Sequence, residues 1–248
     1  MIGLTGVGGG SLMTPILVLL FGQSPVVAVG TDLMFSATTK LAATASLGYS
    51  QRVDWRIVMR LSIGSIPAAT AVLVCFWVMR RVPGIETRIV PQCLAVMLGL
   101  TAIGLLLQDK LQRLGLKLTA SSVGRFERYK VALTIMAGVL LGAAVTLTSV
   151  GAGALGAVAL LFLYPLRLTP DRLVATDIAH ALPVTLLAAL GHATLGHVNL
   201  QVLACLLLGS VPGVVIASRA LIHIPPKLTR VLIAVMLGVV SQRMLFGS

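Results

Sequence analysis

Two acidic side chains lie inside apolar stretches of this sequence, and a threonine precedes each of them. Thr31 and Asp32 stand in the run Val-Gly-Thr-Asp-Leu, and Thr176 and Asp177 stand in Val-Ala-Thr-Asp-Ile, 145 positions later. Carboxyl groups inside membrane spans are costly and indicate function, and the chemistry open to them is proton exchange during transport. Capping of a helix near the membrane surface is the alternative role. Each threonine hydroxyl could bond a ligand or its own helix.

Three further polar side chains could act beside the acids. Asp32, Ser36 and Lys40 recur at every fourth residue, so on a helix they share one face. Lys40 could neutralise Asp32, bind a substrate anion, or extend to the membrane surface. His180 follows Asp177 closely and could relay protons or be a packed, hydrogen-bonded histidine.

Two glycine clusters also occupy equivalent positions, and each precedes an apolar run too short to span a bilayer, residues 12–21 and 154–164. Glycine lets a membrane helix break where it lines a cavity. The short helices that follow would aim free N–H groups at the midplane, which makes an anion site. Close packing of helices through small residues is the alternative. The candidate substrate-binding residues are Gly8, Gly9, Gly10, Ser11, Thr31, Lys40, Ser149, Gly151, Gly153 and Thr176, and the candidate proton-coupling residues are Asp32, Asp177 and His180.

The composition indicates that membrane helices position these residues. Of the 248 residues, 57% are hydrophobic and 10% are charged, whereas soluble domains carry about 25% charged residues. The net charge of +12 comes from residues that flank apolar spans and would face anionic headgroups, so it does not indicate a nucleic-acid partner. The three cysteines lack CxxC spacing and predict neither a metal site nor a disulfide framework.

The chain consists of two related halves. Gly-Ser-Ile-Pro at residues 64–67 returns as Gly-Ser-Val-Pro at 209–212, and such duplication in an apolar chain is typical of transporters with a site between the halves. We predict an all-α membrane bundle of about eight segments built from two inverted repeats. The expected units are a first repeat over 1–107, a basic cytoplasmic linker over 108–130, and a second repeat over 131–248.

The distribution of positive charge predicts how the halves are oriented. Residues 50–60 and 108–130 carry excess positive charge, which places both in the cytoplasm. If the chain turns back at Gly-Ala-Gly, residues 151–153, the basic segment 219–230 is cytoplasmic too, and equivalent loops lie on opposite sides. The apolar run at 131–148 has no counterpart before the first glycine cluster, so we expect an N-terminal helix to be missing upstream of Met1.

Three motifs resemble the TauE/SafE family of sulfite and organosulfur-anion exporters, which are permease-like membrane transporters. They are G-x-G-G-G-S-x-x-x-P at 6–15, A-V-G-T-D-L at 28–33, and Q-R-V-D-W at 51–55. The resemblance extends over essentially the whole chain and implies a transporter of two similar halves for sulfite, thiosulfate or a sulfonate. Gln51 departs from the family pattern, which carries glycine there, and the second repeat has Gly-Ala-Gly.

We therefore expect a secondary transporter of the inner (plasma) membrane rather than an enzyme, exporting a small sulfur-containing anion by proton-coupled alternating access. No nucleotide or cofactor motif is present, and the expected partners are the anion and membrane lipid, while the small-residue helix faces permit a homodimer. One alternative is a cation or metal carrier that uses Asp32, Asp177 and His180. Another is an intramembrane hydrolase with Ser36 as nucleophile and Lys40 as base, and a third is a membrane scaffold that transports nothing.

Overall fold

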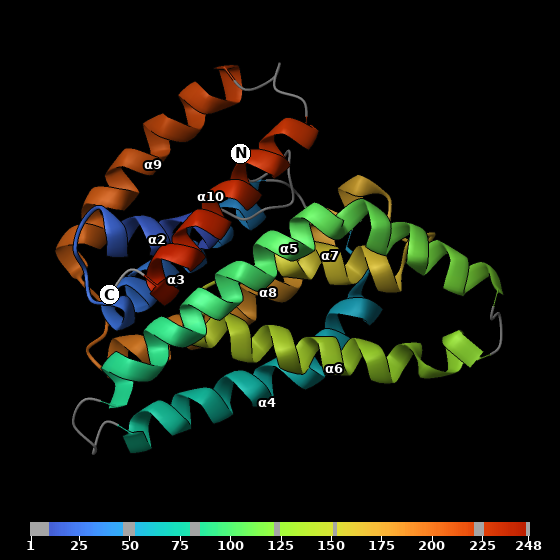
Figure 1. Ribbon diagram of the computed structural model, residues 1–248, viewed down its shortest axis with the longest axis horizontal. Coiled ribbons are helices and arrows are strands. Elements are labelled where there is room, and N and C mark those ends of the chain that lie inside the picture. The colour runs from blue at the N-terminus through green and yellow to red at the C-terminus, as the bar shows by residue number, and fades with distance from the viewer. Residues whose placement is uncertain are drawn as a thin grey trace.

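The computed structural model describes residues 10–46, 53–79, 85–121, 125–150, 153–220 and 226–246. These residues form nine helices and no strand, which confirms the predicted all-α polytopic bundle (Figure 1). The predicted site residues Gly8, Gly9 and Gly151 lie outside the described residues. The helices are α2 (Gly10–Leu19), α3 (Pro25–Ser46), α4 (Trp55–Met79), α5 (Ile85–Ser121), α6 (Arg125–Thr148), α7 (Ala154–Leu163), α8 (Pro170–Thr194), α9 (Leu200–Ala220) and α10 (Pro226–Phe246).

The four described helices of the first half each have a counterpart in the second half. α2 and α7 are the short apolar helices expected after the glycine clusters, and each has ten residues. α3 and α8 both begin at a proline, whose fixed φ suits the first helical position. α4 corresponds to α9, and α5 corresponds to α10. α6 precedes α7 and covers the first apolar span expected for the second half, whereas most of the expected linker, 108–130, belongs to the end of α5.

The second half opens with a re-entrant hairpin. α6 ends at Thr148, Ser149 takes a left-handed φ of 58°, and Gly153, with φ 131°, precedes α7. At the end of α7 the Tyr164 hydroxyl lies 2.8 Å from the Thr134 hydroxyl near the start of α6. The chain therefore turns back at the glycine motif, as predicted, and residues 131–164 do not form a single crossing.

Two matching hydrogen bonds relate the repeats by a twofold exchange. The N–H of Asn199, directly before α9, donates to the Thr31 hydroxyl in α3 at 2.9 Å. The N–H of Asp54, directly before α4, donates to the Thr176 hydroxyl in α8 at 3.1 Å. Each bond turns into the other when the repeats are exchanged, and the two bonds lie at opposite ends of the bundle. The repeats are thus inverted, as the charge distribution predicted.

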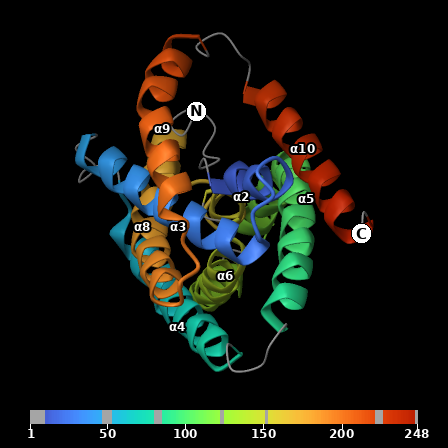
Figure 2. The same ribbon diagram turned by 90° about the vertical axis from the view of Figure 1, so that its left-hand side faces the viewer.

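We call one end of the bundle the basic end. It contains the beginnings of α4 and α6, with Arg60 and Lys130, and the loop after α7, with Arg167. We call the other end, where Asn199 directly precedes α9, the opposite end. Figure 2 shows α9 and α10 apart from one another, with α10 packed along α5.

Within the part of the chain that the structure describes, four helical segments are long and apolar enough to cross a membrane. They are Trp55–Met79, Pro91–Lys117, Tyr129–Thr148 and Arg172–Thr194. The segment in α8 is 61% buried and the one in α4 only 28%. α8 is therefore an interior helix, and α4 presents most of its surface outward, where lipid would lie. The functional side chains are expected on the interior helix.

Glycines set the close contact of α4 with α6. A Cβ added to Gly138 would collide with the Leu61 carbonyl, and one added to Gly142 would collide with the Ser65 carbonyl. Small residues let membrane helices approach in this way. The contact fixes Ser65 in the interior, where its side chain is fully buried.

Candidate functional site

The two acids and the lysine meet in the interior, where α3 and α8 pack together. Asp32 is 0% exposed, and Lys40 and Asp177 are each 4% exposed. Lys40 interacts electrostatically with Asp177 and with Asp32, and its ammonium donates to the Ser36 hydroxyl at 2.5 Å. Lys40 is thus buried between the acids and does not extend to the membrane surface. We call Asp32, Lys40 and Asp177 the central charge cluster.

Neither acid caps a helix, because each lies two turns inside its helix. Asp32 Oδ2 accepts a 2.6 Å hydrogen bond from the Thr14 hydroxyl of α2. Asp177 lies against the first turn of α7, where a Cβ added to Gly156 would collide with Asp177 Oδ1. Each acid therefore contacts the short helix of its own repeat.

Ser149, at the break between α6 and α7, comes close to Asp32 from the other repeat. The Ser149 side chain interacts with the Asp32 carboxyl. Among the described residues, however, neither Ser149 Oγ nor Asp32 Oδ1 completes a hydrogen bond, although both atoms are buried. Buried polar groups without partners are rare and need an explanation such as a water, ion or ligand. This pair marks a place where a ligand oxygen or a proton can enter.

Thr31 and Thr176 lie where the repeats contact one another. The two hydroxyl oxygens accept the N–H of Asn199 and of Asp54, respectively. Asn199 Oδ1 also accepts the Val202 N–H at 3.1 Å, so Asn199 caps its helix. Each threonine precedes an acid in the sequence and accepts a hydrogen bond from the residue directly before a helix of the other repeat.

His180 extends the site toward α4. Its Nε2 lies 2.9 Å from the Ser65 hydroxyl, and His180 is 3% exposed. His180, Asp177 and Gly156 line a cavity of about 10 Å³, which has room for about one water molecule. This cavity has no room for a group of several heavy atoms.

Ser149 and Gly153 lie in the bend between α6 and α7. Gly10 and Ser11 belong to the first turn of α2. Gly153 caps α7 without a side-chain hydrogen bond to the first turn. The first N–H groups of a helix can bind an anion.

Sequence reasoning missed four residues of the site: Thr14, Ser65, Gly156, and Asn199, which donates a hydrogen bond to Thr31. Thr14 stands inside the G-x-G-G-G-S-x-x-x-P motif, so its position was marked although its bond to Asp32 was not. Ser65 and Asn199 act through contacts between segments far apart in the sequence. No local pattern indicates such contacts.

The rival chemistries find less support in this geometry. Within the described part of the chain, no group of three His, Cys, Asp or Glu side chains could hold a metal ion. Ser36 and Lys40 do form the hydrogen bond that a nucleophile and base need. Both are buried, however, and Lys40 also interacts electrostatically with Asp177 and Asp32.

Comparison with known proteins gives one family and one curated relative. The family model described as "Sulfite exporter TauE/SafE" matches residues 1–244. The "Probable membrane transporter protein YjnA" of Bacillus subtilis (strain 168) is 37% identical over 227 residues, which cover 92% of this chain and 86% of the relative. No solved structure matches the chain significantly.

Proposed function

This chain belongs to the sulfite exporter TauE/SafE family of membrane transporters, and from that membership we propose that it exports a small sulfur-containing anion with coupling to protons. Sulfite, thiosulfate and sulfonates are the proposed substrates. The relative with 37% identity is described as a transporter, and neither it nor the family is described as an enzyme. The proposal therefore concerns what is carried and how.

The central charge cluster is the observation that carries the proposal. Ionisable groups in the membrane interior mark ion or proton pathways, and inverted-repeat transporters bind substrate between the repeats near the midplane. Asp32, Lys40 and Asp177 are buried together between α3 and α8, one helix from each repeat. The substrate anion would bind Lys40 and the uncapped first turn of α7.

The charge of the cluster links anion binding to protonation. With both carboxyl groups ionised the cluster has a net charge of −1, which repels an anion in a poorly screened interior. One proton makes the cluster neutral and a second makes it positive. Anion and proton therefore favour each other's binding and move together, and the net direction follows the sum of their gradients.

The burial of the central charge cluster supports alternating access. The cluster is buried and its cavity holds about one water, so the repeats must separate on one side to admit the anion and on the other to release it. We place the basic end in the cytoplasm of the inner (plasma) membrane because positively charged segments remain there.

The test is flux of radiolabelled sulfite in vesicles that contain the purified protein. We expect saturable flux that a proton gradient, acidic on the sulfite side, accelerates, and that thiosulfate or taurine inhibits. Asp32→Asn and Asp177→Asn should each remove the dependence on the gradient. Asp109→Asn, an exposed acid on α5, is the matched control and should behave as the native protein.

The outcomes separate the parts of the proposal. Absence of flux for all these anions, from folded protein, would overturn the substrate class. Saturable flux that ignores the proton gradient would leave the substrate class standing and would overturn the coupling.

A further inference from the structure

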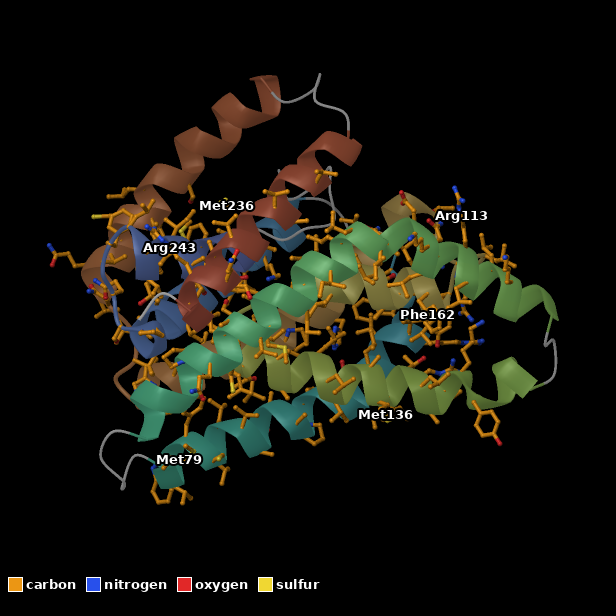
Figure 3. All side chains as sticks on the ribbon, in the orientation of Figure 1. Met79, Arg113, Met136, Phe162, Met236 and Arg243 are labelled. Carbon is orange, nitrogen blue, oxygen red and sulfur yellow. The ribbon has the colours of Figure 1, made fainter. Side chains whose placement is uncertain are left out.

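The basic end contains a second site with the chemistry of an anion site. It is a pocket of about 410 Å³, roughly 15 Å from the central charge cluster because the ten-residue α7 separates them. Figure 3 shows Phe162, near the end of α7, and Arg113 of α5 at this end of the molecule. The lining residues are Arg60, Lys130, Val131, Tyr164, Pro165, Leu166 and Arg167.

Tyr164 organises the positive charge of this pocket. The Tyr164 side chain is buried, its hydroxyl lies 2.8 Å from Thr134, and Arg60 Nη1 donates to the same hydroxyl at 3.4 Å. The Lys130 ammonium lies 5.0 Å from the centre of its ring. Among the described residues, the lining has three cationic side chains and no acidic one, and a cleft lined by one sign of charge attracts the opposite ion.

Asp54 is the acid that neutralises part of this charge from beside the pocket. Arg167 Nε donates to Asp54 Oδ2 at 2.6 Å, and Arg172 Nη2 lies 3.8 Å from the same oxygen. Among the described residues Arg172 Nε is buried without a hydrogen-bond partner. If an anion takes Arg167, Asp54 can move to Arg172, so no buried charge is left unpaired and the exchange costs little.

The ion pair is connected to the central charge cluster. The Asp54 N–H donates to Thr176, which adjoins Asp177. The twofold-related bond at the opposite end joins Asn199 to Thr31 and lacks these charges. Asn199 is neutral, and the positions equivalent to Arg167 and Arg172 are Gly22 and Val27. The repeats therefore have the same contact at both ends, but within the described residues this contact is accompanied by an ion pair at the basic end alone.

We propose that the pocket of Arg60, Lys130, Tyr164 and Arg167 binds the transported anion before it reaches the central charge cluster, and that the anion does so by displacing Asp54 from Arg167. This inference rests on the proposed function and adds an entry site to it. The ligand is a sulfite, thiosulfate or sulfonate group, whose oxygens match the planar guanidinium of arginine. The exchange loosens the Asp54–Thr176 contact and begins opening at the basic end.

The test compares Arg167→Gln with Arg113→Gln, a change of an exposed arginine outside the pocket. Binding of radiolabelled sulfite to the purified protein should weaken by about tenfold in Arg167→Gln, the loss of one charge-assisted hydrogen bond. Arg167→Lys should restore part of the binding, and Arg113→Gln should leave it unchanged. Asp54→Asn, which copies Asn199, should strengthen binding because it releases Arg167.

A second measurement uses sided flux in inside-out and right-side-out membrane vesicles. Arg167→Gln should raise the half-saturating sulfite concentration by about tenfold at the basic end and leave it unchanged at the opposite end. An equal change at both ends, or none at either, would overturn the entry site while native flux keeps the proposed function. Lost binding in Arg167→Gln without any native flux would keep the anion pocket and overturn the transport of sulfite. An effect seen only in vesicles with anionic lipid would overturn the proposal in favour of a lipid headgroup.

Discussion

At the scale of single residues, the contact of Gly156 with Asp177 should decide whether the second acid works. A methyl group at Gly156 would collide with Asp177 Oδ1, so in Gly156→Ala the carboxyl must turn away from α7. We expect sulfite flux to fall by about tenfold or more, which corresponds to a loss of about 1.4 kcal/mol or more of interaction free energy. Gly209→Ala is the matched control, because nothing lies within 4 Å of the added methyl. Equal flux in both variants would show that Asp177 does not act from this position.

The corresponding contact in the first repeat is a hydrogen bond rather than a close approach. Thr14 donates to Asp32 at 2.6 Å and is fully buried, and Thr14→Val keeps the shape while removing the donor. A hydrogen bond to a charged group contributes about 1.5–3 kcal/mol, so we expect flux to fall by roughly tenfold to a hundredfold. Thr14→Ser should restore it. Loss of flux in Thr14→Ser as well would point to packing and would contradict a role for the hydroxyl.

Some of these residues could be predicted and others could not, for a physical reason. Asp32, Asp177 and Lys40 are conspicuous because charge inside an apolar span is costly. Thr14, Ser65 and Asn199 are common residue types whose roles arise from contacts between distant segments. Their positions depend on how the repeats pack, which hydrophobic periodicity does not encode.

At the scale of elements, the packing of α4 against α6 holds Ser65 beside His180. Gly142 allows this packing, since a Cβ there would collide with the Ser65 backbone. We expect Gly142→Ala to lower the free energy of unfolding by about 1–3 kcal/mol through overpacking, seen as a lower thermal midpoint of the purified protein. Gly238→Ala, where the added methyl meets nothing within 4 Å, should be neutral or slightly stabilising. A thermal midpoint unchanged by Gly142→Ala would mean that the two helices can separate freely.

The elements themselves were largely predictable. The short apolar runs after the glycine clusters became α2 and α7, and the turn before α7 was indicated by the excess of positive charge on one side. The polar stretch from residue 108 predicted a linker outside the membrane. The structure shows that α5 continues through this stretch as a helix to Ser121. Polarity reports the surroundings of a segment and not its backbone conformation, which explains why the helix end was not visible in the sequence.

At the scale of the whole molecule, inverted repeats predict that transport needs both ends to open in turn. The contacts Asp54–Thr176 and Asn199–Thr31 close the basic and the opposite end, respectively. In each pair a backbone N–H donates to a threonine hydroxyl, so cysteines at these positions are candidates for a disulfide, and counting free thiols after oxidation checks that it forms. The native cysteines are Cys75, Cys93 and Cys205, and they would first be replaced by alanine.

In that background, oxidation of Asp54→Cys/Thr176→Cys should abolish sulfite flux, and reduction should restore it. Oxidation of Thr31→Cys/Asn199→Cys should do the same, although the cross-link is at the other end of the bundle. The four single-cysteine variants are the controls, because they lose one contact without being cross-linked. In a channel with a gate at one end, only the cross-link at that gate would block flux. Complete loss of flux with either cross-link therefore requires a molecule that alternates between two closures, whereas continued flux with either one formed would contradict alternating access.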